Sequence, residues 1–278
     1  MSPSLAFHLV LGFGAGGMFI AACSRVAERL GPRLGGLLTG MPSTVVVTFL
    51  FIGYTDSRQR VVEECTFVPV ALALNCVLLA TFGWLASRRV VLALPAAVGV
   101  WVLLAAAAVR WIPRRMDAGL LLLAVTYVVA WSSLPRGAGA GCHPSTLSSP
   151  ARMTLRALVG GAMVALGIWL GSSSGPFLAG ISSSFPVAGV STLGLVSWYR
   201  GTPFAAEMVR PMMTSGSVTI LVYALAVRIT YPGAGVALGT LLALLASTAA
   251  AGLLYLLQNA RNTRAPSPCP PIPPAAGR

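Results

Sequence analysis

Runs of about 20 apolar residues recur along the whole chain, and they constrain its fold more than any other feature. A helix of that length crosses a bilayer, and only 9% of the 278 residues are charged, whereas a soluble domain carries about 25%. The runs are solid rather than alternating, which excludes an outer-membrane barrel. The sequence therefore predicts an all-α integral membrane protein with about nine transmembrane helices. The predicted spans are roughly 5–27, 32–54, 62–86, 90–112, 118–134, 152–172, 176–199, 204–229 and 233–258.

The charge is strongly basic, with 19 Lys and Arg residues against six acids. All of the basic residues are Arg, and they stand singly or in pairs between the apolar runs, where positive charges orient membrane proteins. This placement argues against a nucleic-acid partner. If the N-terminus lies outside, the inner connections and tail carry 13 Arg and the outer ones six, although the outer group at 110–115 runs against the trend. We expect a multi-pass protein of the bacterial inner membrane with an outside N-terminus and a cytoplasmic C-terminus.

Two stretches with one shared pattern, Gly31–Pro42 and Gly175–Pro186, lie 144 positions apart. Both read G-P-x-L-small-G-apolar-x-[ST]-small-apolar-P. At this offset the chain aligns with itself without a gap over roughly fifty positions, which indicates an internal duplication. The other matches include Leu11/Leu155, Gly16/Gly160, Gly17/Gly161, Ala21/Ala165, Val46/Val190, Thr48/Thr192 and Glu63/Glu207.

The duplication divides the chain into two four-span repeats, residues 1–115 and 152–260. Residues 116–151 then form a spacer helix followed by a flexible loop rich in Gly, Ser and Pro. Because the spacer adds one crossing, the second repeat is expected to be inverted relative to the first, as in inverted-repeat transporters. The Pro-rich residues 261–278 are expected to be a disordered tail.

Pro42 and Pro186 fall inside the second and seventh predicted spans. Proline lacks an N–H and clashes with the carbonyl four residues back, and a bilayer tolerates such a defect only where protein or a water-filled cavity satisfies it. If both helices break, two half-helix N-termini meet at the midplane and can bind an anionic or polar group. The alternative is a pair of kinks that allow close packing. The predicted substrate-binding residues are Thr39, Gly40, Pro42, Ser43, Ser182, Ser183, Ser184 and Pro186.

Glu63 and Glu207 each stand near the start of the helix that follows a break, and we predict a coupling or gating role for them. The alternative is an ordinary acid in an early helical turn. Arg210, one turn after Glu207, is predicted either to pair with it and meet an anionic substrate or to extend to the interface. Asn75, deep in the third span, is interpreted as a packing hydrogen bond. The remaining acids are interpreted as ordinary: Glu28, Asp56, Glu64 and Asp117.

No catalytic, metal-binding or cofactor-binding constellation is found in the sequence. The five Cys residues are odd in number and form no CxxC pair, and the two His residues stand far apart. No Ser/His/acid set or HExxH pattern is present. We therefore expect no enzyme activity, no metal and no cofactor.

The two Gly-Pro stretches, each followed by a helix with an early Glu, resemble small four-span bacterial inner-membrane proteins of the GlpM-like type. The chain looks like two such units fused in tandem through a spacer helix. The resemblance covers most of each repeat and implies no particular activity.

The leading prediction is a secondary transporter or exporter of a small polar or anionic substrate, either free or lipid-linked. Alternating access would occur around the broken helices. The partners are then the lipid bilayer and this substrate, and the composition also suits a homo-oligomer or a second membrane protein. The first alternative is a non-transporting membrane scaffold or assembly factor, and the second is a membrane-embedded lipid-modifying enzyme.

Overall fold

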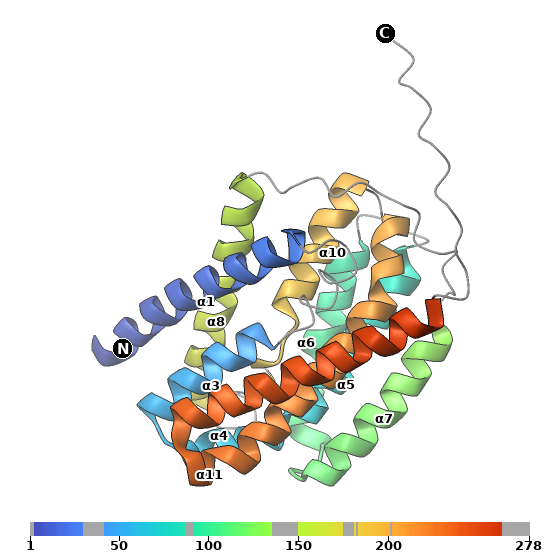
Figure 1. Cartoon of the computed structure of the whole chain (residues 1–278). Helices are drawn as coiled ribbons and strands as arrows, with labels where there is room; N and C mark the ends of the chain where they lie inside the picture. Colours follow the sequence, from blue (N-terminus) through green and yellow to red (C-terminus); the bar gives the residue numbers. More distant parts are fainter. Residues whose placement is uncertain are drawn as a thin grey trace, which may run out of the picture.

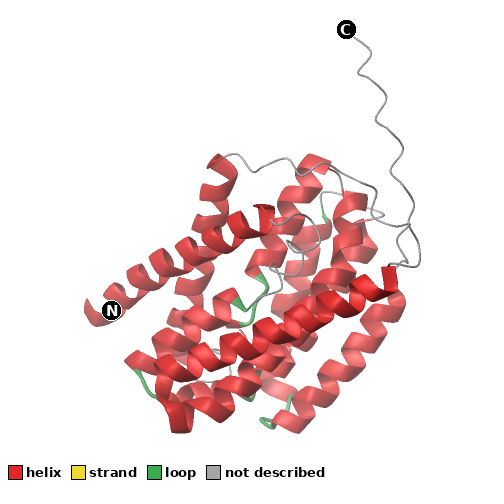
Figure 2. Cartoon of the chain, viewed as in Figure 1, coloured by secondary structure: helices red, strands yellow, loops and turns green. Residues whose placement is uncertain are grey.

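The computed structural model describes residues 3–29, 42–86, 92–134, 150–174, 181, 183–200 and 202–262. These residues form helices and short connections, with no strand in the described ranges (Figures 1 and 2). In chain order the helices are α1 (Pro3–Arg29), α3 (Ser43–Thr55), α4 (Arg58–Cys65), α5 (Val68–Ala86), α6 (Ala93–Trp111), α7 (Met116–Ser133), α8 (Pro150–Ser174), α10 (Val187–Arg200) and α11 (Thr202–Asn262).

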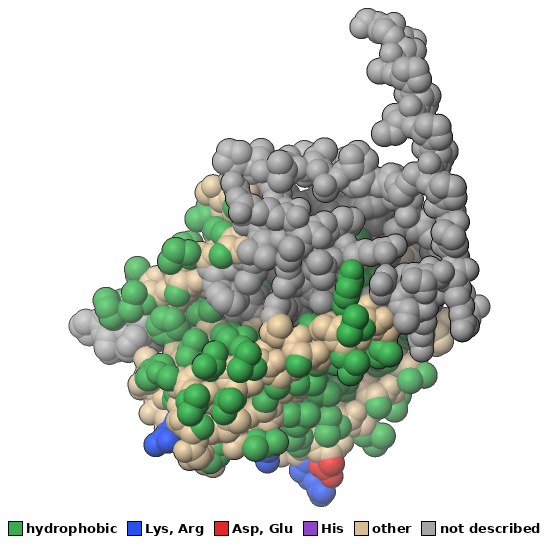
Figure 3. Space-filling model, viewed as in Figure 1, with side chains coloured by type: hydrophobic (Ala, Val, Ile, Leu, Met, Phe, Trp, Pro, Cys, Tyr) green, Lys and Arg blue, Asp and Glu red, His purple; other side chains and the backbone are tan. Residues whose placement is uncertain are grey.

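Four of the described helices, α5, α6, α7 and the greater part of α11, are long and apolar enough to cross a membrane. Large apolar side chains lie exposed on the outer faces of α1, α6, α7 and α11, as Figure 3 shows for one face of the molecule. In a membrane these faces would contact lipid, which removes the cost of exposing them to water. The expectation of an all-α chain with membrane-spanning helices agrees with this structure.

α1 and α8, which begin the two predicted repeats, cross at glycines. A Cβ on Gly17 would lie 2.6 Å from the carbonyl oxygen of Ala157, and a Cβ on Gly161 would clash with the carbonyl oxygen of Phe13. The two contacts are equivalent under the 144-residue offset, because Gly17 corresponds to Gly161 and Phe13 to Ala157. From Phe13 to Gly17 along α1, the contacting residue of α8 changes from Gly161 back to Ala157. The two helices therefore pack in antiparallel fashion. Glycine permits this close approach of two backbones.

Helix starts also repeat at the same offset. α3 begins at Ser43 and α10 at Val187, while α4 begins at Arg58 and α11 at Thr202. α3 and α10 both pack against α8 and α11. The 144-residue offset seen in the sequence is therefore accompanied by matching starts for these two pairs of helices.

The third predicted span, 62–86, is divided in the structure. α4 ends at Cys65, a turn occupies Thr66 and Phe67, and α5 begins at Val68. Arg228 of α11 fixes the end of α4, since its Nη1 donates to Thr66 Oγ1 at 2.7 Å and reaches the carbonyl oxygen of Val62 at 3.5 Å. The second repeat has no such division, because α11 continues through the equivalent positions.

α11 covers the last two predicted spans and folds back on itself at Gly235. This glycine has φ +80°, a left-handed conformation that other residues rarely adopt. The two arms are joined by a hydrogen bond between the Tyr231 hydroxyl and Thr240 Oγ1 at 2.8 Å, and by one from Ser247 Oγ to the Thr219 carbonyl at 3.0 Å. The arms therefore run antiparallel.

The described connections α3–α4, α6–α7 and the bend of α11 lie at one end of the molecule (Figure 1). The charged side chains that Figure 3 shows gather at this end. It is called the charged end below and carries Asp56, Arg58, Arg60, Glu63, Arg114, Arg115, Asp117 and Arg228.

Candidate functional site

The two prolines of the predicted site each stand directly before a short helix. α3 has 13 residues and α10 has 14, so each is about 20 Å long, shorter than the ~30 Å hydrocarbon core of a bilayer. The carbonyl of Pro42 accepts from the Val46 N–H at 2.8 Å, and the carbonyl of Pro186 accepts from the Val190 N–H at 2.8 Å. The N–H groups before these have no partner within the helix and give each start a partial positive charge.

Polar side chains are buried beside both helix starts. Thr48, one turn into α3, and Ser184, just before Pro186, are each 1% exposed, and neither hydroxyl oxygen has a hydrogen-bond partner. Thr44, Ser183 and Thr192 are buried as well. An unpartnered buried hydroxyl is costly, so such a group marks a position where another polar molecule would be stabilising.

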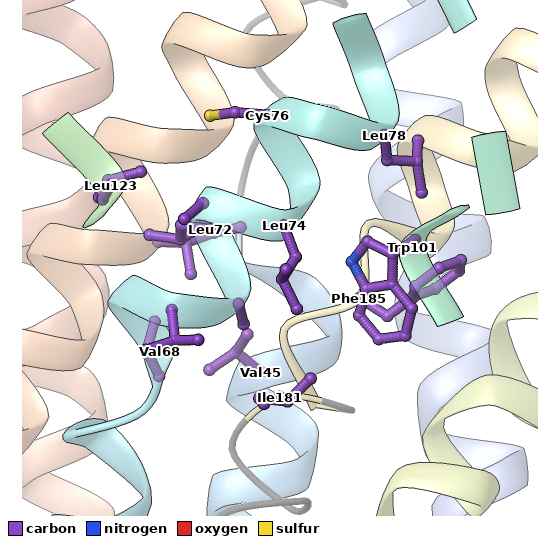
Figure 4. Close-up of a cluster of buried hydrophobic side chains, with 14 of the residues drawn as sticks. Val45, Val68, Leu72, Leu74, Cys76, Leu78, Trp101, Leu123, Ile181 and Phe185 are labelled. Atoms are coloured by element: carbon purple, nitrogen blue, oxygen red, sulfur yellow. The ribbon is translucent and has the colours of Figure 1, made fainter. Parts of the chain in front are cut away.

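The second break is tied to the first repeat by Asn75 in the middle of α5. Its Nδ2 donates to the Ser184 carbonyl at 2.7 Å, and its Oδ1 accepts from Trp101 Nε1 of α6 at 2.9 Å. Trp101 also packs edge-on against Phe185, with ring centroids 4.7 Å apart (Figure 4). Val45 of α3 belongs to the same buried cluster. The sequence predicts a packing hydrogen bond for Asn75, and the structure shows that its partner is the chain at the second break.

Replacing Asn75 with Leu should destabilise the protein by about 2–5 kcal/mol, because the Ser184 carbonyl and Trp101 Nε1 would both lose their buried partner. The check is thermal unfolding of the purified protein in detergent. Thr126→Val is a matched control, since the Thr126 hydroxyl bonds only to carbonyls of its own helix. In the Asn75→Leu background, Trp101→Phe should recover part of the lost stability, because it removes the buried N–H that no longer has an acceptor. Equal stability of the Asn75→Leu and Thr126→Val variants would contradict this account.

The predicted gating residues are separated in the structure. Glu63 is exposed on α4, at the charged end, and Glu207 is half-buried in the first turns of α11. Arg210 donates to the carbonyls of Trp131 and Leu134 at 2.9 and 2.5 Å, and it lies 4.8 Å above the Trp131 ring. It thus caps the C-terminal end of α7, where a cation is favoured. Among the described residues, no ion pair joins Arg210 to Glu207.

Several predicted site residues fall beyond the part of the chain that the structure describes. Thr39, Gly40 and Ser182 lie outside the described residues, as do most of the two Gly-Pro stretches. Ser43 is the first residue of α3, and its side chain also lies outside the described set.

Glu64 is the acid that sequence reasoning passed over. It is fully buried, whereas the neighbouring Glu63 is exposed. The spacing carried a signal: Val61 and Cys65, four residues apart, lie on one buried face of α4, and Glu64 falls on this face while Glu63 does not.

No group of three or more His, Cys, Asp or Glu side chains within the described ranges is arranged to hold a metal ion. Among the described residues, the polar groups near Pro42 and Pro186 are hydroxyls, the amide of Asn75 and backbone groups, which suit a polar or anionic ligand rather than a transition metal. No protein-family model, curated protein or solved structure matches the chain.

Proposed function

We propose that the protein is an inverted-repeat secondary transporter of a small polar or anionic substrate in the bacterial inner membrane. One observation carries the proposal: two short helices begin immediately after Pro42 and Pro186, 144 residues apart, beside buried hydroxyls without partners. A helix start that faces the protein interior is a ready anion-binding site.

The reciprocal antiparallel contact between α1 and α8 supports the inverted arrangement of the repeats. Two copies related by a two-fold axis make each contact twice, with the roles of the partners exchanged, as Gly17–Ala157 and Gly161–Phe13 do. An axis in the membrane plane then brings the two helix starts to the midplane from opposite sides. We further propose that the N-terminus lies outside, with the charged end facing the same side.

The substrate would be held by N–H groups at the two helix starts and by hydroxyls such as those of Thr48 and Ser184. A carboxylate, a phosphate or the polar headgroup of a lipid shares this chemistry. No acid–base pair accompanies these groups among the described residues, so the proposed function includes no chemical step.

The test is uptake and efflux by reconstituted vesicles with a panel of carboxylates, phosphates, amino acids and lipids with polar headgroups. Pro42→Ala and Pro186→Ala should lower the flux of the transported compound at least tenfold, because continuous helices would remove the free N–H groups. Pro211→Ala is the matched control, since this exposed proline lies within α11 and does not precede a helix start. Unchanged flux in both site variants would rule out the proposed binding site. A folded protein that transports none of the tested compounds would contradict the proposed transport function.

A membrane scaffold is the second candidate, and the burial of the breaks favours it. The exposed fractions of Val45, Ile181 and Ser184 are all 1% or less, as expected for helices that stay packed against one another permanently. A closed state of a transporter has the same property, and the flux assay separates the two.

A further inference from the structure

Glu64 is a buried acid that the proposed substrate site does not use. Its side chain is 0% exposed, and neither carboxylate oxygen accepts a hydrogen bond. Among the described residues, the ion pair of Glu64 is with Arg60, whose Nε lies 3.9 Å from Oε1, beyond hydrogen-bond distance. The Arg60 guanidinium makes a shorter ion pair with Asp56, at 3.0 Å.

A carboxylate in such surroundings takes up a proton, because a buried charge without hydrogen bonds is far less stable than the neutral acid. Burial raises the pKa of Glu64 to about 8, Arg60 lowers it, and Asp56 and Glu63 raise it. α4 lies at the charged end and precedes α5, which is long and apolar enough to cross a membrane, and its neighbours Asp56 and Glu63 are exposed.

The helices packed against α4 are α3, α5 and α11. α5 contributes no acid or basic residue. Arg228 of α11 hydrogen-bonds to the end of α4 rather than to Glu64. The charged and titratable groups of α3, α4 and α11 in this region are Tyr54, Asp56, Arg58, Arg60, Glu63, Cys65, Tyr223, Arg228 and Tyr231.

α4 connects the helix that begins at the first break with the helix that contacts the second. It follows α3, which begins after Pro42, and it precedes α5, whose Asn75 holds the Ser184 carbonyl of the second break. A displacement of α4 would therefore be transmitted to both helix starts.

We propose that Glu64 is the proton-binding site of this protein, and that loss of its proton to water at the charged end releases α4 from the helices packed against it. The neutral acid stabilises the packed state. The carboxylate is stable only when it is hydrated, which requires α4 to move away from the helices packed against it. The inference rests on the proposed function in one respect, since it identifies the proton as the coupling ion.

Hydrogen exchange of the full chain in detergent tests the proposal directly. Exchange of the α4 amides is compared at pH 6.5 and pH 9 in the wild type, Glu64→Gln and Glu63→Gln. Variants are compared at the same pH, so that the intrinsic chemical rate of exchange cancels. At pH 9 the wild type and the Glu63→Gln variant should exchange about tenfold faster in α4 than the Glu64→Gln variant, because Glu64 is then about 90% ionised. At pH 6.5 all three should agree. Equal α4 exchange in the wild type and the Glu64→Gln variant at pH 9 would overturn the proposal.

An infrared difference spectrum provides a second readout that does not depend on how the Glu64→Gln variant folds. The wild type and the Glu63→Gln variant should lose the C=O band of a protonated carboxylic acid with a midpoint near pH 8. A wild-type spectrum without that loss would also overturn the proposal. Neither readout uses a substrate, so the proton-binding role of Glu64 can be supported even when no compound is transported. It can equally be overturned while transport at the two helix starts is intact.

Discussion

The wild-type protein should lose stability as the pH rises from about 5 to 8, and the Glu64→Gln variant should lose much less. In the folded protein burial raises the pKa of Glu64 from 4.5 to about 8. The folded state therefore keeps a proton that the unfolded state releases once the pH exceeds 4.5. Stability from this proton is fully present below pH 4.5 and is lost as the pH rises to 8, by up to about 1.4 kcal/mol per pH unit.

The measurement is the unfolding temperature in detergent between pH 5 and 9, expressed as the difference between the wild type and the Glu64→Gln variant. Taking the difference removes the contribution of every group that titrates equally in both proteins. In the folded protein the neighbouring Cys65 thiol stays protonated in this window, because burial raises its pKa above its ordinary value, and its contribution is common to the wild type and the variant. Glu63→Gln is the control and should keep the wild-type dependence, since Glu63 is exposed. A Glu64→Gln variant with the full wild-type slope would show that the buried acid is not protonated.

The features that sequence alone predicts well depend on local pattern. Apolar runs locate the four described helices that are long and apolar enough to cross a membrane, and the duplicated stretches locate the helix starts after Pro42 and Pro186. The turn at Thr66 and Phe67 is missed, because the cap that ends α4 comes from Arg228, 162 residues from Thr66. No local pattern shows a capping group that distant.

The features that sequence does not predict are long-range contacts of single polar side chains. Asn75 is recognisable as a buried amide, but its partner Ser184 lies 109 positions away. Sequence spacing pairs Arg210 with Glu207, one turn away, whereas the guanidinium binds the carbonyls that end α7. Glu63 matches Glu207 in the repeat and draws attention for that reason, although the buried face of α4 carries Glu64 instead. Repeat symmetry predicts only what the two halves share, whereas the contacts of Asn75, Arg210 and Glu64 differ between the halves.

Gly17→Ala and Gly161→Ala should each destabilise the protein by about 1–3 kcal/mol, which is the usual cost of overpacking a close contact. Each new Cβ would press against a backbone carbonyl of the facing helix, Ala157 for one and Phe13 for the other. A backbone atom cannot rotate away as the end of a side chain can, so α1 and α8 must separate. The control is Gly14→Ala, where nothing lies within 4 Å and helix propensity alone favours Ala. Thermal unfolding in detergent measures all three variants.

The double variant is the sharper measurement, because the two glycines serve one crossing. Once the first Cβ has pushed α1 and α8 apart, the second finds part of its space already open, so the combined loss should be smaller than the sum of the single losses. The two single losses should also be similar, since the Gly17 contact and the Gly161 contact exchange under the 144-residue offset. Unequal losses of stability, or a Gly17→Ala variant as stable as Gly14→Ala, would contradict the reciprocal crossing of α1 and α8. The main structural support for inverted repeats would then be lost.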